Sequence, residues 1–92
     1  MTKIRVHVYV SGRVQGVYFR QGTKNHAQGQ DITGWVRNLD DGRVEAVFEG
    51  EQSAVQVLIK YCTQGPKDAL VKNVDTIWEL YQGEFQSFDI IY

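Results

Sequence analysis

The chain has 92 residues, of which 42% are hydrophobic, so it is long enough for one packed domain and too short for two. Ten Lys and Arg against eleven Asp and Glu leave a formal net charge of -1, which argues against nucleic acid or an anionic membrane as a partner. The single cysteine, Cys62, can form no disulfide within the chain, and no apolar run approaches the roughly 20 residues of a membrane span, so we predict one cytoplasmic domain over residues 1–92.

The first predicted strand covers residues 3–11, where Ile4, Val6, Val8 and Val10 alternate with polar or aromatic residues. A glycine-bracketed segment follows from Gly12, and residues 19–31 are then predicted as a helix. The apolar stripe of this helix is thin, because it depends on Phe19, Thr23 and Ala27. Two internal glycines each cost about 1 kcal/mol, so tertiary packing must hold the helix.

A hairpin is predicted next, with strands over residues 32–39 and 43–49 joined by Asp40-Asp41-Gly42. The second predicted helix covers residues 51–64 and stops at Gly65-Pro66. One face of this helix is apolar and consists of Ala54, Val55, Leu58, Tyr61 and Cys62. Two more strands are predicted at 71–80 and 84–91, separated by Tyr81-Gln82-Gly83.

The order strand, helix, strand, strand, helix, strand is the split βαβ pattern, here followed by one further strand. It predicts an α+β fold, the ferredoxin-like α/β sandwich, with an antiparallel or mixed sheet and both helices on one face. The pattern does not say which edge of the sheet the fifth strand joins.

The segment from Gly12 to Arg20 is the first candidate for a binding site. A glycine-bracketed loop before a helix can point several backbone N–H groups at one anion, and the helix start adds partial positive charge. Arg20, in the first turn of that helix, can grip two phosphate oxygens with its planar guanidinium. Taken singly, the glycine spacing is more often that of a tight strand-to-helix turn, and a lone Arg is most often a solvated surface residue.

The residues of this segment, Gly12-Arg13-Val14-Gln15-Gly16-Val17-Tyr18-Phe19-Arg20, resemble the acylphosphatase signature, a Gly-x-Val-Gln-Gly-Val-x-Phe-Arg run. Eighteen residues after Arg20, the stretch Gly34-Trp35-Val36-Arg37-Asn38 is similar to the family's second signature in type and spacing. The resemblance continues through Gly65-Pro66 to Phe88 and so spans nearly the whole chain.

The resemblance implies an enzyme that hydrolyses the carboxyl-phosphate bond of acyl phosphates without a metal or other cofactor. Arg20 and Asn38 are then the catalytic residues, with Arg20 gripping the phosphate and Asn38 placing the attacking water. The loop residues that hold the phosphate are Val14, Gln15, Gly16, Val17, Tyr18 and Phe19. A small acyl phosphate is the expected partner, inorganic phosphate is the expected product and inhibitor, and a monomer is expected.

This reaction suits the residues available. An acyl phosphate releases a carboxylate whose conjugate acid has a pKa of ~4 to 5, so no general acid is required. Backbone amides and one arginine can stabilise the phosphoryl group, and an asparagine can accept a hydrogen bond from water although it is no strong base. Phosphate monoesters have poorer leaving groups and normally need metals, general acids or covalent nucleophiles, so the sequence favours acyl phosphates.

Other polar residues have simpler interpretations. His7 and His26 are separated and are interpreted as surface or half-exposed residues, Asp40 and Asp41 as turn formers, and Cys62 as a core residue. Two alternatives stay open: a non-catalytic ferredoxin-like module that binds a phosphorylated molecule such as carbamoyl phosphate, and, more weakly, an RNA-binding sheet.

Two positions depart from the family pattern. Tyr18 stands where many members have Gly, so its ring could influence which acyl group is accepted. The end of the first helix lacks the family's usual leucines, and Ile32 is its clearest apolar counterpart.

Overall fold

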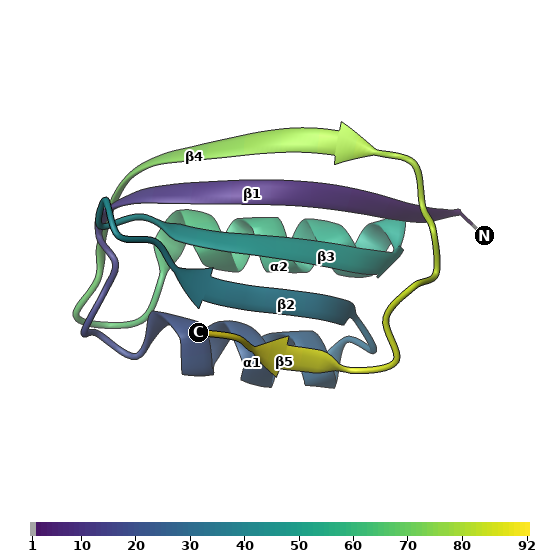
Figure 1. Cartoon of the computed structure of the whole chain (residues 1–92), viewed down its shortest axis with the longest axis horizontal. Helices are drawn as coiled ribbons and strands as arrows, with labels where there is room; N and C mark the ends of the chain where they lie inside the picture. The colour runs from purple at the N-terminus through teal and green to yellow at the C-terminus, as the bar shows by residue number, and fades with distance from the viewer. Residues whose placement is uncertain (1) are drawn as a thin grey trace.

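A five-stranded sheet with both helices packed on one of its faces makes up the computed structural model, which describes residues 2–92 (Figure 1). The elements in chain order are β1 (Lys3–Arg13), α1 (Phe19–Gly29), β2 (Thr33–Asn38), β3 (Val44–Glu51), α2 (Gln52–Gln64), β4 (Leu70–Glu79) and β5 (Phe88–Ile90). The predicted order of elements and the ferredoxin-like fold are confirmed. None of the helices in the described residues is long and apolar enough to cross a membrane.

The sheet is mixed, with the strand order β4-β1-β3-β2-β5. β1 pairs antiparallel with β3 and β4, β2 pairs antiparallel with β3, and β5 pairs parallel with β2. The fifth strand therefore lies at the edge opposite β4. Residues 80–87 have to cross the sheet from one edge to the other, as Figure 1 shows.

This crossing explains why the last strand is shorter than predicted. The sequence predicted residues 84–91, but only Phe88–Ile90 form β5. Strand pairing needs a neighbouring edge, and the chain reaches the edge of β2 only where Gly34 N donates to Ser87 O at 3.0 Å and Ile91 N donates to Val36 O at 2.9 Å.

The first helix ends at Gly29, two residues before the predicted end at Asp31. Gln30 N donates to His26 O and Ala27 O at 3.1 Å, and Asp31 then takes a left-handed φ of 56°. This turn brings Ile32 back into the interior, where it is buried. Ile32 is thus the apolar residue at the end of α1 that the sequence indicated.

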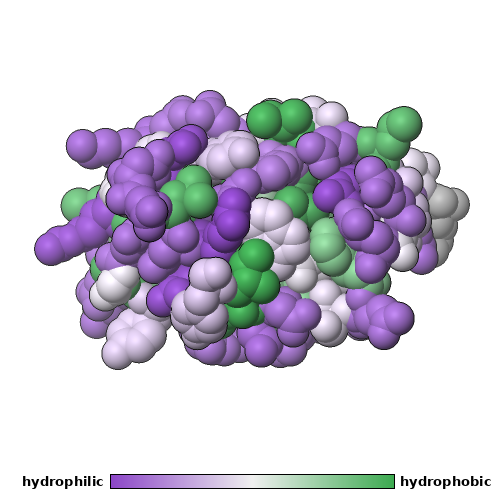
Figure 2. All heavy atoms as spheres, viewed as in Figure 1, coloured by the Kyte–Doolittle hydropathy of each residue, from purple (hydrophilic) through white to green (hydrophobic). Residues whose placement is uncertain are grey.

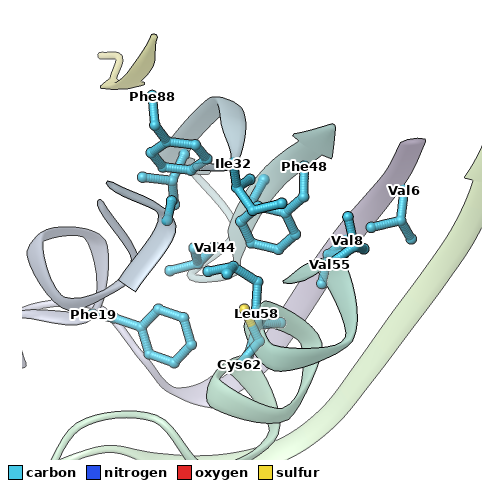
Figure 3. Close-up of a cluster of buried hydrophobic side chains, with 14 of the residues drawn as sticks. Val6, Val8, Phe19, Ile32, Val44, Phe48, Val55, Leu58, Cys62 and Phe88 are labelled. Carbon is cyan, nitrogen blue, oxygen red and sulfur yellow. The ribbon is translucent and has the colours of Figure 1, made fainter. Parts of the chain in front are cut away.

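The core lies between the sheet and the helices (Figure 3). Val6, Val8 and Val10 of β1 face it, as their alternation predicted, and the predicted stripe of α1 is buried as well. Cys62 is buried among these side chains, and burial raises the pKa of its thiol to about 12. A thiol with this pKa is not ionised at neutral pH, which confirms its core role.

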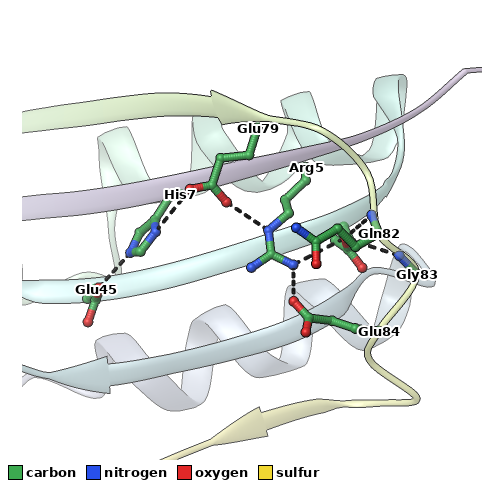
Figure 4. A network of polar contacts seen from close by, with 8 residues as sticks. Arg5, His7, Glu45, Glu79, Gln82, Gly83 and Glu84 are labelled. Atoms are coloured by element: carbon green, nitrogen blue, oxygen red, sulfur yellow. Dashed lines mark hydrogen bonds and ion pairs between the residues drawn. The ribbon is translucent and has the colours of Figure 1, made fainter.

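The opposite face of the sheet is mostly hydrophilic (Figure 2) and has a network of ion pairs (Figure 4). His7 Nε2 lies 2.5 Å from Glu45 Oε2, and Arg37 Nε donates to Glu45 Oε1 at 2.6 Å. The sequence showed no carboxylate partner for His7, because Glu45 reaches it only through the pairing of β1 with β3. Burial raises the pKa of Glu45, but the hydrogen bonds from His7 and Arg37 outweigh burial and bring this pKa below its ordinary value.

We predict that Glu45 makes stability depend on pH. Its folded-state pKa lies below the ordinary value of 4.5, so its contribution is present above pH 4.5 and is lost as the pH falls through the folded-state pKa. Glu45→Gln should lower the free energy of unfolding at neutral pH by about 1–3 kcal/mol, with a smaller deficit in acid. Urea unfolding of both proteins across this range measures the effect.

Glu51→Gln is the control for this experiment, because Glu51 takes part in none of the ion pairs found in residues 2–92. A deficit for Glu45→Gln that stays constant down to strongly acidic pH would contradict the assignment.

Candidate functional site

A pocket of about 360 Å³ opens at the start of α1. Its lining residues are Val14, Gly16, Tyr18, Phe19, Arg20, Gln21, Asn38, Ile90 and Tyr92. The structure therefore brings Arg20 and Asn38, which are 18 residues apart in the chain, to one pocket together with four of the six predicted loop residues. Gln15 and Val17 are not among the lining residues.

The loop between β1 and α1 is held at both ends by buried side chains. Val14 and Phe19 are 1% and 2% exposed, whereas Tyr18 between them is 81% exposed. Gly16 has a φ of 74° and Tyr18 a φ of 66°, both in the left-handed region. For a tyrosine this conformation is unfavourable by about 1–2 kcal/mol, and such strained residues cluster at binding and active sites.

The start of α1 is uncapped. No side chain caps it, and its first turn contains no acidic residue. Gly22 N donates to Tyr18 O at 3.0 Å and closes the first turn, so the amides that precede Gly22 have no acceptor within the helix. These amides and the positive end of the helix dipole lie beside the pocket, an arrangement that favours a bound anion.

Arg20 supplies the pocket with a cation that no carboxylate of the described residues neutralises. None of the ion pairs in residues 2–92 includes it. Its guanidinium carbon lies 5.4 Å from the centre of the Tyr92 ring, a cation–π contact. Tyr92 is 99% exposed, so this is a surface contact, and it leaves the N–H donors of Arg20 free for an anion.

Asn38 is the last residue of β2, and it pairs with Val44 at the start of β3. Its Oδ1 is buried and has no hydrogen-bond partner among residues 2–92. Buried amide oxygens are rarely left unpartnered, because the cost is about 1–3 kcal/mol. Asn38 lines the pocket, so this free acceptor belongs to a residue of the site.

The side chain of Gln15 joins the loop to the β2–β3 hairpin. Its Nε2 donates to Leu39 O at 2.7 Å and to Arg43 O at 2.9 Å. Within the hairpin, Asp41 Oδ1 accepts from Arg43 N at 3.1 Å, which confirms Asp41 as a turn former. Gln15 thus holds Asn38 and the loop together from outside the pocket.

Three lining residues were missed by the sequence analysis: Gln21, Ile90 and Tyr92. Gln21 follows Arg20 directly and could have been included with it. Ile90 and Tyr92 gave no signal, since their place in the site depends on β5 lying next to β2.

The family model for acylphosphatase matches residues 6–90. The chain belongs to the acylphosphatase family. An acylphosphatase of Roseiflexus sp. (strain RS-1) is 54% identical over 100% of this chain and 99% of its own length. This name and the family match place the chain in the acylphosphatase class of hydrolases, which act on acyl phosphates, rather than among non-catalytic modules.

Solved acylphosphatases share the fold described above. The structure from Bacillus subtilis superimposes with a TM-score of 0.93 at 32% identity, covering 97% of this chain and 99% of that one. The structure from Coxiella burnetii has a TM-score of 0.91 at 36% identity, covering 97% and 93%. The ferredoxin-like architecture is therefore that of the acylphosphatases.

We predict that Gln15→Glu loosens the site. A carboxylate has the shape of the amide but cannot donate to Leu39 O and Arg43 O, so both partly buried carbonyls lose a partner. The expected results are a loss of about 2–3 kcal/mol in unfolding free energy and a fall of roughly tenfold in kcat/KM. Chemical unfolding and acyl phosphate hydrolysis measure them.

Gln28→Glu is the matched control, because Gln28 is exposed on α1 and makes no such contact in the described residues. Equal behaviour of the two variants would mean that the Gln15 link does not organise the site.

Proposed function

We propose that the pocket at the start of α1 is the active site for acyl phosphate hydrolysis, with Arg20 and the loop residues 14–19 holding the phosphate and Asn38 placing the attacking water. The observation that carries this proposal is the convergence of three unused groups on one pocket. These are the uncapped helix start, a guanidinium outside every recorded ion pair, and a buried amide oxygen without a partner in residues 2–92.

The phosphate would lie against the first-turn amides, with Arg20 donating to its equatorial oxygens. Phosphoryl transfer spreads charge over these oxygens in the transition state, and donors already in place stabilise that charge without rearranging. The ring of Tyr92 supports the guanidinium from one side. Binding and transition-state stabilisation would thus both depend on Arg20.

Asn38 would orient the water for attack in line with the carboxylate leaving group. An amide oxygen can accept a hydrogen bond from water but is too weak a base to take its proton. The proton would therefore go to a phosphate oxygen of the substrate or to solvent. Since the leaving carboxylate is a weak base, its departure needs no protonation by the enzyme.

Two further properties belong to the proposal. Inorganic phosphate, the product, would occupy the same donors and inhibit competitively. We also propose that the chain acts as a cytoplasmic monomer, in keeping with a buried Cys62 that is not available for disulfides between chains.

The proposal predicts different kinetic defects for the two polar residues. Arg20→Ala should lower kcat/KM by about 10²–10³ and raise the inhibition constant of inorganic phosphate, because the guanidinium contacts phosphate in both ground and transition states. Asn38→Ala should lower kcat by about 10²-fold with little change in phosphate inhibition. Benzoyl phosphate hydrolysis measures both.

Lys24→Ala, on the same helix but outside the pocket lining, is the control for loss of a positive charge. An inactive wild type would remove the enzyme assignment, and an unaffected Arg20→Ala would remove the assignment of roles.

Tyr18 at the pocket mouth should influence the acyl group. Its exposed ring lines the pocket, so Tyr18→Gly should change the relative kcat/KM of aromatic and small aliphatic acyl phosphates by about 3–10-fold. Glycine also adopts the left-handed conformation without strain, so the variant should not lose stability. Identical preferences in the two proteins would exclude this role.

A further inference from the structure

A buried carboxylate on the helix-free face of the sheet holds the segment that crosses from β4 to β5. Glu49 of β3 is 1% exposed, and its Oε2 accepts from Gln82 N at 2.8 Å and from Gly83 N at 3.3 Å. Figure 4 shows the two amides turned toward this network. Two backbone donors on one carboxylate oxygen fix the middle of the crossing segment.

Arg5 strengthens the same anchor. Its guanidinium contacts Glu49 at 3.4 Å, and it also pairs with Glu84 of the crossing segment. Its third partner, Glu79 at 2.8 Å, is the last residue of β4 and does not belong to the crossing segment. Desolvation by burial lowers the pKa of Arg5, but the bonds to these carboxylates outweigh it and bring this pKa above its ordinary value.

The crossing segment needs an anchor because it spans most of the sheet. Four strand spacings separate β4 from β5, which is about 19 Å. Residues 80–87 could reach roughly 26–29 Å when fully extended, so the length alone leaves slack. Glu49 and Arg5 remove that slack at its midpoint.

Beyond the anchor, β5 is held by its pairing with β2 and by packing against α1. It has three residues and pairs only with β2 among the described strands. Its one buried ring, Phe88, stacks on Phe48 with 5.7 Å between the ring centres. Ile90 and Tyr92 then line the pocket, and Tyr92 lies over Arg20. A short edge strand of this kind opens locally at low free-energy cost.

We propose that Glu49 is a positioning residue for the phosphate pocket: by holding Gln82 and Gly83 it keeps β5 docked, and docked β5 keeps Tyr92 against Arg20. The inference rests on the proposed role of Arg20 in binding phosphate. Loss of the anchor raises the population of molecules in which β5 is undocked, and phosphate binds those molecules more weakly.

The test compares Glu49→Gln with Glu79→Gln in the full chain. Glu49→Gln should raise KM for benzoyl phosphate and the inhibition constant of phosphate by about 3–10-fold, with kcat within about twofold. Exchange of the Ile91 amide with solvent should quicken by at least this factor, because this amide donates to Val36 O only when β5 is docked. Glu79→Gln removes an Arg5 pair but no bond to the crossing segment, and it should leave KM unchanged.

A double-mutant cycle with Tyr92→Gly separates positioning from general stability. In the Tyr92→Gly background, Glu49→Gln should change KM by less than about 1.5-fold, since the ring that it positions is absent. An unchanged KM in the single variant, or an undiminished effect in the double variant, would overturn the proposal.

A second variant keeps the test decisive if Glu49→Gln does not fold. Glu84→Gln removes a half-exposed anchor of the same segment and should raise KM in the same direction by about twofold. In that case an unchanged KM for Glu84→Gln overturns the proposal. Arg20→Ala separates the role of Glu49 from the assignment of the pocket. If Arg20→Ala does not weaken inhibition by phosphate, the pocket assignment fails. If Arg20→Ala weakens it as expected but Glu49→Gln leaves KM unchanged, only the role of Glu49 is overturned.

Discussion

Two hydrogen bonds from the Gln15 side chain connect the parts of the molecule that form the site. The loop and Arg20 follow β1, whereas Asn38 ends β2, and these strands are not neighbours in the sheet because β3 lies between them. Gln15 reaches across to the carbonyls of Leu39 and Arg43 and fixes the loop against the hairpin. The relative position of Arg20 and Asn38 in the candidate site depends on this connection.

Charge is distributed unequally between the two faces of the molecule. On the helix-free face, Arg5 and Arg37 lie against carboxylates, and these pairs hold the strands and the crossing segment. At the pocket, Arg20 contacts the ring of Tyr92 and takes part in no recorded ion pair in residues 2–92. A guanidinium that is oriented but not neutralised keeps its donors for an anion, and a chain of net charge -1 can therefore bind one locally.

The β5 edge links these two faces. It carries Ile90 and Tyr92 into the pocket, while its approach is held by Glu49 from the other side of the sheet. In our proposal, a buried acid on the helix-free face thus influences phosphate affinity without contacting the substrate. The physical basis is the short length of β5, since a three-residue edge strand responds to the loss of one anchor.

The sequence by itself determined the fold class, the order of the elements and the enzyme family. Local information suffices for these. Alternating apolar residues mark β1, and the stripe at Phe19, Thr23 and Ala27 marks α1. The two signature segments are recognised from their own residue types. Only the tertiary structure decided the edge that β5 joins, the partner of His7, the bridging role of Gln15 and the presence of Tyr92 in the pocket. Each of these depends on strand pairing between residues far apart in the chain, which no local period encodes.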